Sequence, residues 1–128
     1  MQFNKKKNGD MEKLPKPSID TGMGIERVAA VLQGTSDNYE VDIFRNIIEF
    51  TKEQFQIKEN EYTKIPLRII SDHLRSVGFL ISDGVLPSNE GRGYVLRRIL
   101  RRAIRHIYNL NIKTENFYKL VPILIKEM

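Results

Sequence analysis

The chain has 128 residues, 41% of them hydrophobic and 29% charged, which is ordinary for a globular protein and enough for one domain or for one domain with part of another. It contains no cysteine, so disulfide bonds and thiolate metal sites are excluded. No apolar run approaches the ~18 residues of a membrane span, and the polar N-terminus lacks the apolar segment of a signal peptide, so we expect a soluble cytoplasmic protein that contacts no membrane.

The first twenty residues are expected to form extended chain and turns. Asn8-Gly9-Asp10 signals a tight turn, and it follows Gln2-Phe3-Asn4 closely enough to predict a hairpin. Pro15 and Pro17 then keep the chain extended. Two short strands do not make a stable sheet by themselves. Met1 is therefore expected to fall inside a domain whose earlier strands are missing.

The rest of the chain is predicted to be helical from the spacing of its apolar residues. A helix from Gly24 to Gln33 ends at Gly34, the favoured residue just past a helix. Pro66 suits the first turn of a third helix, which follows a polar link at residues 60–64. Thr114 is a candidate cap for a fifth helix, which Pro122 should kink unless it lies near the start. The second and fourth helices are expected at residues 41–57 and 90–110.

These elements make the fold class mainly α, with an α+β remnant at the N-terminus. The domain boundary is expected between Gly34 and Asn38, because everything after Gly34 is predicted to be helical. Residues 1–34 then form a short strand and hairpin piece with one helix, and residues 35–128 form a separate helical region.

The net charge of +5 is concentrated in the fourth predicted helix and its flanks. From Pro87 to Lys113 the only acid is Glu90, so this segment carries a net charge of +6 and the rest of the chain −1. A charge gathered in one element favours a polyanion partner. The arginines of the segment are Arg92, Arg97, Arg98, Arg101, Arg102 and Arg105.

Five of these arginines are expected on one face of the helix. At ~100° per residue, Arg97, Arg98, Arg101, Arg102 and Arg105 share one arc and the apolar residues fill the opposite half. No acid lies three or four residues away on that face to relieve the repulsion, and a planar guanidinium suits phosphate oxygens. The pattern favours a nucleic-acid backbone, while an acidic partner domain and a plain solvated surface remain the alternatives.

The loop from Pro87 to Gly93 leads into this helix. Asn89 or Ser88 is suited to cap its N-terminus. Asn89 also carries a donor and an acceptor on a short stem, which could read a base in the shallow minor groove of RNA. Gly91 and Gly93 would let the backbone approach a ligand closely. The residue types alone leave both roles of Asn89 open.

A second candidate segment runs from Asp20 to Arg27. Its two glycines, Gly22 and Gly24, stand between an extended stretch and a helix start, where a phosphate could bind backbone N–H groups. The full GxGxxG dinucleotide fingerprint is absent, since Arg27 occupies the last glycine position. A simple strand-to-helix turn with a surface Glu-Arg pair is the alternative.

Two long strings resemble one known family. Gly22-Met23-Gly24-Ile25-Glu26-Arg27-Val28 is similar to motif 3 of class II aminoacyl-tRNA synthetases. The string from Leu14 to Gly24 and the string from Ser82 to Arg98 narrow the resemblance to the alanyl-tRNA synthetase family. It covers essentially the whole chain and is weakest from Phe50 to Lys64. It implies the end of a class II catalytic core at residues 1–34 and the start of a helical tRNA-recognition region at 35–128.

The resemblance also implies ligands and residue roles. ATP with Mg²⁺ and L-alanine would be substrates of the parent enzyme, with Arg27, Gly24 and Glu26 at the ATP and with Asp20 and Gly22 at the alanine. In that family, the asparagine that matches Asn89 helps to read a G·U pair, so Asn89 would contact the acceptor stem of tRNA(Ala). The acceptor-stem phosphates would lie against Arg92 and the five arginines of the helix face.

Other parts of that family's machinery are expected outside this chain. Motifs 1 and 2 would precede Met1, and an aspartate that cooperates with the asparagine would follow Met128. The isolated chain is therefore expected to be inactive. Zinc would bind only in parent regions outside this chain, and His73 and His106 are expected to be packing or surface residues. A non-catalytic helical RNA-binding module is the alternative function, and a structural piece that docks on an acidic domain is the third.

Overall fold

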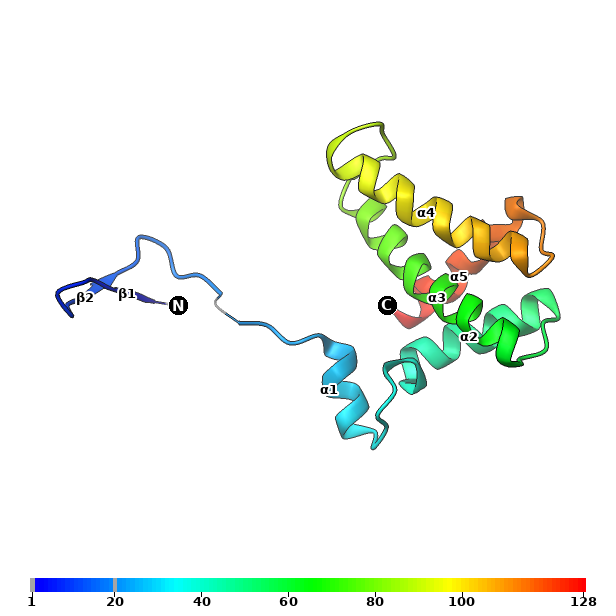
Figure 1. The fold of residues 1–128 in the computed structure, drawn as a ribbon, viewed down its shortest axis with the longest axis horizontal. Helices are drawn as coiled ribbons and strands as arrows, with labels where there is room; N and C mark the ends of the chain where they lie inside the picture. Colours follow the sequence, from blue (N-terminus) through cyan, green and yellow to red (C-terminus); the bar gives the residue numbers. More distant parts are fainter. Residues whose placement is uncertain (1, 20) are drawn as a thin grey trace.

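The computed structural model describes residues 2–19 and 21–128 of the chain. It begins with an antiparallel hairpin of β1 (Phe3–Lys5) and β2 (Met11–Lys13), in which Phe3 pairs with Lys13 and Lys5 with Met11. The hairpin turns at Gly9, as the sequence predicts. Figure 1 shows the hairpin apart from the helices, at the end of an extended stretch.

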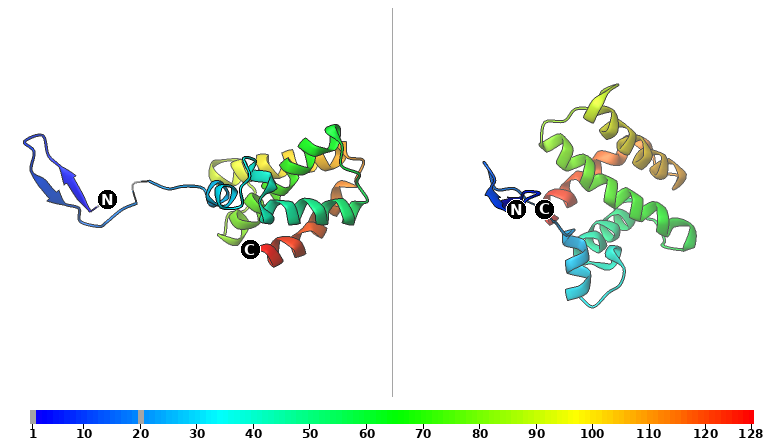
Figure 2. Two further views of the ribbon diagram at one scale, coloured as in Figure 1. Left: turned by 90° about the horizontal axis from the view of Figure 1, so that it is seen from below. Right: turned by 60° about the vertical axis from the view of Figure 1, so that its left-hand side comes forward.

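Five α-helices and two short 3₁₀ segments follow the hairpin in the described residues, so the prediction of a mainly α fold with a small strand piece is confirmed. The views in Figures 1 and 2 show the helices gathered into one body with the hairpin outside it. Across the described residues, no helix is long and apolar enough to span a membrane. The elements are α1 (Ile25–Leu32), η1 (Asn38–Glu40), α2 (Asp42–Phe55), α3 (Glu61–Ser82), α4 (Gly91–Asn109), η2 (Thr114–Leu120) and α5 (Val121–Glu127).

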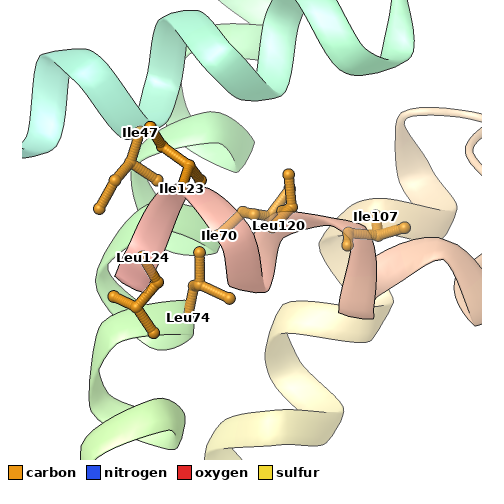
Figure 3. Close-up of a cluster of buried hydrophobic side chains, with 7 residues drawn as sticks. All are labelled: Ile47, Ile70, Leu74, Ile107, Leu120, Ile123 and Leu124. Atoms are coloured by element: carbon orange, nitrogen blue, oxygen red, sulfur yellow. The ribbon is translucent and has the colours of Figure 1, made fainter. Parts of the chain in front are cut away.

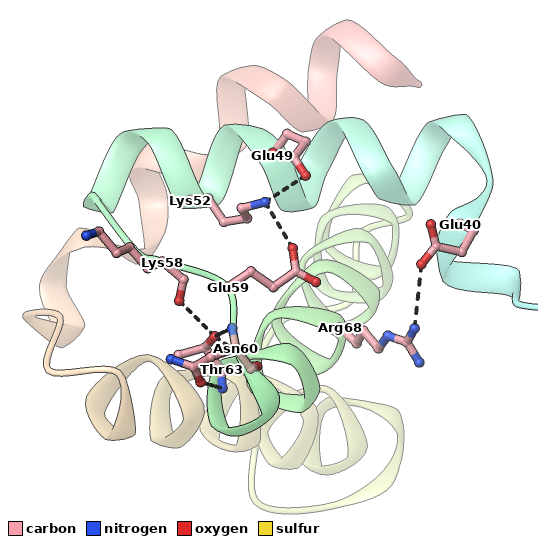
Figure 4. A network of polar contacts seen from close by, with 8 residues as sticks. All are labelled: Glu40, Glu49, Lys52, Lys58, Glu59, Asn60, Thr63 and Arg68. Carbon is pink, nitrogen blue, oxygen red and sulfur yellow. Dashed lines mark hydrogen bonds and ion pairs between the residues drawn. The ribbon is translucent and has the colours of Figure 1, made fainter.

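The start of α3 differs from the prediction. Asn60 accepts the backbone N–H groups of Tyr62 and Thr63 at 2.9 and 3.0 Å, and Thr63 Oγ1 accepts the N–H of Asn60 at 2.9 Å (Figure 4). This reciprocal capping box starts the helix five residues before Pro66. Pro66 thus lies inside α3 rather than in its first turn, and residues 60–64 are not a separate link.

The last part of the chain also differs in detail. Thr114 begins the 3₁₀ segment η2 and caps no helix with its side chain. The helix α5 starts later, at Val121, with Pro122 in its first turn. A proline is tolerated there because the first N–H groups of a helix have no partner within it. The prediction that Pro122 lies near a helix start is confirmed, and the cap by Thr114 was wrong.

One hydrophobic cluster joins four of the helices and η2. Its members come from α2, α3, α4, η2 and α5, and their side chains meet where α5 crosses the others (Figure 3). Gly78 of α3 adds a notch, because a Cβ there would collide with the Leu124 side chain. The buried residues of the cluster are Ile47, Ile70, Leu74, Ile107, Leu120, Ile123 and Leu124.

A smaller cluster attaches α1. It contains Ala30, Val41 and Phe44, with Tyr39 packed against it. The helix itself ends at Gln33, and Gly34 follows with φ of +71°, a conformation that favours glycine. Thus α1 packs on the beginning of the helical body, and the boundary between residues 34 and 38 stays a prediction.

Candidate nucleic-acid and nucleotide surfaces

The helix α4 presents one face to the core and the other to solvent. Its buried residues Gly93, Leu96, Ala103 and Ile107 follow helical spacing, and α3 packs alongside (Figure 1). Val95, expected on the core face, is instead 53% exposed. All six arginines are exposed: Arg92, Arg97, Arg98, Arg101, Arg102 and Arg105.

We call Arg97, Arg98, Arg101, Arg102 and Arg105 the arginine face. Within residues 2–19 and 21–128, no acid forms an ion pair with any of them or with Arg92. The guanidinium of Arg98 lies 5.8 Å from the centre of the Tyr94 ring. The sequence predicts no acid three or four residues away from these arginines. In the described part of the chain, folding brings no distant acid into an ion pair with them either.

Two open hollows lie along this face. One of about 410 Å³ is lined by Tyr94, Arg97, Arg98 and Arg101. The other, of about 380 Å³, lies between α3 and α4 and is lined by His73, Val95, Arg98, Ile99 and Arg102. Both combine several cationic groups with open access, which suits the oxygens of a phosphate backbone.

Asn89 does not cap α4. The N-cap residue is Glu90, no side chain bonds the first N–H groups, and Ser88 Oγ donates to the Glu90 carbonyl oxygen at 2.7 Å. The Asn89 side chain instead accepts a hydrogen bond from Arg97 Nη1 through Oδ1. Because a guanidinium only donates, this contact turns the amide oxygen toward Arg97 and leaves the two N–H groups of Nδ2 available to a partner. The capping prediction for Asn89 and Ser88 was wrong.

Gly93 has a packing role rather than a ligand-binding one. It is buried, and a Cβ at this position would collide with the Leu86 carbonyl oxygen and the Ser88 side chain. The loop from residue 86 to 88 thus folds back on the first turn of α4. Gly91 has φ of +57° and open space where a side chain would be. Packing alone accounts for the glycine at position 93. The expectation that Gly91 and Gly93 let the backbone approach a ligand stays a prediction.

The second candidate segment leads into α1. Asp20, one of its predicted site residues, lies outside the described residues. Gly22 and Gly24 are exposed and have no left-handed backbone, and Gly24 is the N-cap of α1. A Cβ on Gly22 would meet nothing, and one on Gly24 would meet only Glu26 Oε2, at 3.2 Å. Backbone conformation does not demand glycine at either position.

Glu26 and Arg27 are adjacent but face different surroundings. Glu26 is partly buried and forms an ion pair with Arg75 of α3. Burial raises the pKa of the Glu26 carboxyl, but its own backbone N–H and Arg75 more than offset this and lower it below the usual range. Arg27 is exposed, and none of the described acids pairs with it. Of this predicted ATP set, Arg27 is therefore the side chain left accessible.

The two histidines lie near the arginine face. His106 is partly buried, and its Nδ1 has no hydrogen-bond partner among the residues that the structure describes. Burial, followed by the charges of Arg102, His73 and Arg105, lowers its pKa. His73 Nδ1 lies 2.9 Å from Asp72 Oδ2. No cluster of three metal-ligating side chains occurs among the residues that the structure describes.

Sequence reasoning missed Arg68 and Arg75, which bind acids far away in the chain. Arg68 pairs with Asp37. The pKa of the Asp37 carboxyl is lowered, chiefly because it accepts the backbone N–H of Tyr39; burial opposes this shift and Arg68 adds to it. A seven-residue spacing on one helix face was the only signal available. The partners of these arginines could not be read from it, since they come from a different element.

Known proteins are similar in sequence to this chain along its whole length. The family model described as tRNA synthetases class II (A) matches residues 1–128. An alanine–tRNA ligase of Haemophilus influenzae (strain PittGG) is 58% identical over 128 residues, which is 100% of this chain and 14% of that relative. The alanine–tRNA ligases of Shewanella loihica and Psychrobacter sp. (strain PRwf-1) are 56% and 55% identical, with the same coverage. The chain thus spans 14% of the length of these curated relatives. With the motif 3 string at the head of α1 and a family model that covers every residue, the chain belongs to the class II (A) tRNA synthetase family.

Proposed function

We propose that the chain acts as part of an alanine–tRNA ligase, where α3 and α4 bind the acceptor stem of tRNA(Ala) and the segment before α1 contributes to the ATP and alanine site. The observation that carries the proposal is the arginine face, whose five guanidinium groups pair with no acid in the described parts of the chain. Such a surface suits an anionic partner. The 55–58% identical relatives are named alanine–tRNA ligases, so tRNA is the partner that the proposal assigns to it.

The arginine face would bind phosphates rather than bases. Contacts to phosphate fix the register of a protein on its RNA, but they carry no sequence information. Asn89 is the residue that would recognise a base. Its Nδ2 group stands free at the N-terminal end of α4, on the same exposed side as Arg97. A donor in this place is suited to a base edge in the wide minor groove of an acceptor stem.

The nucleotide part of the proposal depends on the residues before and in α1. Arg27 would neutralise and stack against ATP, which its exposed guanidinium permits, since no acid among the described residues pairs with it. Gly22 and Gly24, which the backbone does not require to be glycine, would leave room for ATP and L-alanine. Asp20 would bind the alanine ammonium. Bound Mg²⁺ would neutralise the phosphates, and these residues would orient the reacting groups.

Salt dependence of tRNA binding tests the proposal. If five phosphates are neutralised, the logarithm of the association constant should fall with the logarithm of salt concentration with a slope of about −4.5, using the duplex-DNA coefficient as a guide for RNA. Arg98→Ala should reduce the slope by about one unit. Binding can be measured by fluorescence anisotropy from about 50 to 200 mM KCl, a range over which this slope predicts a fall of about 500-fold in the association constant. A salt-independent affinity would contradict the proposal.

A non-catalytic RNA-binding module would use the same arginine face. Two results together would favour this alternative over the proposed enzyme. They are salt-dependent binding of tRNA and the absence of any effect of Arg27→Ala on adenylate formation by the ligase that contains this chain. In the proposed enzyme, Arg27→Ala should impair pyrophosphate exchange by at least about 2 kcal/mol, the scale for losing one charge-stabilising group. Docking on an acidic domain would instead leave tRNA binding undetectable.

A further inference from the structure

Two arginines of α3 hold the connection between α1 and α2. Arg68 and Arg75 are seven residues apart, which places them two turns apart on the same side of the helix. Each guanidinium lies over an aromatic ring, Arg68 at 5.0 Å from the centre of Tyr39 and Arg75 at 4.7 Å from the centre of Phe44. The two rings contact each other, with their centres 5.1 Å apart.

Each arginine also binds an acid from the N-terminal side of α2. Arg68 pairs with Asp37 and lies 3.8 Å from Glu40 Oε1 (Figure 4). Arg75 pairs with Glu26, which lies in the first turn of α1. The side chains of Arg75 and Glu26 are only 20% and 18% exposed, so water screens this pair only partly. Arg68 therefore holds the connecting segment, whereas Arg75 holds α1 itself.

The hold on α1 matters because this helix has little else to fix it. It is eight residues long, and Ala30 is its only buried residue among those described. Ile25, Val31 and Leu32 are 65%, 78% and 81% exposed. Packing through two small side chains, Ala30 and the partly buried Ala29, leaves the rotation of a short helix weakly determined. The Glu26–Arg75 contact is a second fixed point, one turn away from Ala30, and it sets that rotation.

We propose that Arg75 is a positioning residue for the ATP step: by holding Glu26 it orients α1, and with it Arg27, relative to the paired helices α3 and α4. This inference rests on the proposed function, because it takes Arg27 as an ATP-binding residue. It also assigns Glu26 a different role from Arg27. The Glu26 carboxylate is engaged by Arg75, so it acts through the placement of α1 and not as a ligand of ATP or Mg²⁺.

The experiment compares variants of the ligase that contains this chain by ATP-dependent pyrophosphate exchange, which needs no tRNA. Arg75→Ala and Glu26→Gln should each raise the KM for ATP about tenfold, because a small misplacement of a binding group is costly. The double variant should be no worse than either single one, since both remove the same contact. Arg68→Ala is the matched control: it removes an arginine from the same side of α3 but leaves the contact with α1 intact. It should lower the melting temperature and leave the KM for ATP unchanged.

Separate outcomes test the inference and the function it rests on. If Arg27→Ala impairs exchange while Arg75→Ala and Glu26→Gln leave the KM for ATP unchanged, the positioning role is overturned and the proposed function stands. If Arg27→Ala has no effect, the ATP assignment itself fails. Effects of Arg75→Ala and Glu26→Gln that multiply in the double variant, or an altered Mg²⁺ requirement in Glu26→Gln alone, would mean that Glu26 binds the nucleotide directly. Should Arg75→Ala fail to fold, Glu26→Gln decides the matter, because it keeps Arg75 stacked on Phe44.

Discussion

Asn89→Ala is expected to reduce the recognition of the acceptor stem while leaving the stability of α4 nearly unchanged. Glu90 and not Asn89 is the N-cap, so the substitution removes no capping bond, whose loss would cost about 1 kcal/mol. It removes only an exposed hydrogen bond from Arg97. Such a bond contributes at most about 1 kcal/mol, and less where water competes for both groups. We therefore expect a change in unfolding free energy below about 0.5 kcal/mol, as for other surface substitutions.

The effect on tRNA should be larger and selective. One good contact to a base edge provides about 1–3 kcal/mol of discrimination. At 1.4 kcal/mol for each factor of ten, the preference for a G·U acceptor stem over a G·C variant should fall about 5- to 150-fold. The assay is aminoacylation kinetics with both tRNAs, alongside urea unfolding, in the ligase that contains this chain. Arg98→Ala is the control, because loss of a phosphate contact should weaken both tRNAs equally.

The result that would refute this reasoning is an equal loss for both tRNAs in Asn89→Ala. Together with a drop in stability of about 1 kcal/mol, it would restore the capping role, at odds with the contact between Asn89 and Arg97. A loss in Arg97→Ala that matches the selectivity change of Asn89→Ala would strengthen the argument. Arg97 turns the amide, and without it the oxygen and nitrogen of Asn89 could exchange places.

Two further predictions concern stability. Gly93→Ala should lower the free energy of unfolding in urea by about 1–3 kcal/mol, because the new Cβ would collide with the Leu86 carbonyl oxygen. Gly22→Ala is the control: its Cβ would face open space, so stability should change by less than about 0.5 kcal/mol. Equal values for the two variants would contradict the packing role of Gly93. Stability should also fall on acidification, because burial and Arg102 lower the pKa of His106 in the folded protein. The stability that the neutral His106 contributes is complete above its unfolded pKa of about 6.5, and it is lost as the pH falls through the folded pKa. Melting temperatures from pH 7.5 to 5 should show this fall flattened in His106→Leu, and an unchanged pH dependence in that variant would contradict it.

Local patterns predicted most of the fold. The hairpin follows from Asn8-Gly9-Asp10, and the two sides of α4 follow from helical spacing, because both depend on residues close in sequence. The predicted start of α3 at Pro66 is wrong because the capping box at Asn60 begins the helix earlier. A proline favours a helix start, but it does not require one.

The parts of the candidate site that sequence could not provide depend on contacts between distant residues. Asn89 was a good cap candidate by residue type, but Arg97 two turns later competes for its oxygen. The ion pair of Glu26 with Arg75 joins residues 49 positions apart in the chain, and the assignment of Glu26 to ATP stays a prediction. Neither arginine is visible as a partner in a local pattern. The assignments of Arg27, Asp20 and the tRNA-binding arginines to their ligands remain predictions.

The arginine face makes the protein respond to ionic strength in two opposite ways. Guanidinium groups four residues apart on α4 repel one another, and the described acids offer no relief. Dissolved ions shield that repulsion, so moderate salt should favour the folded free protein. If the arginine face binds tRNA as proposed, the same ions compete with the arginines for RNA phosphates and weaken the complex. A cell that raises its internal salt would then hold more of this helix folded and less of it on tRNA.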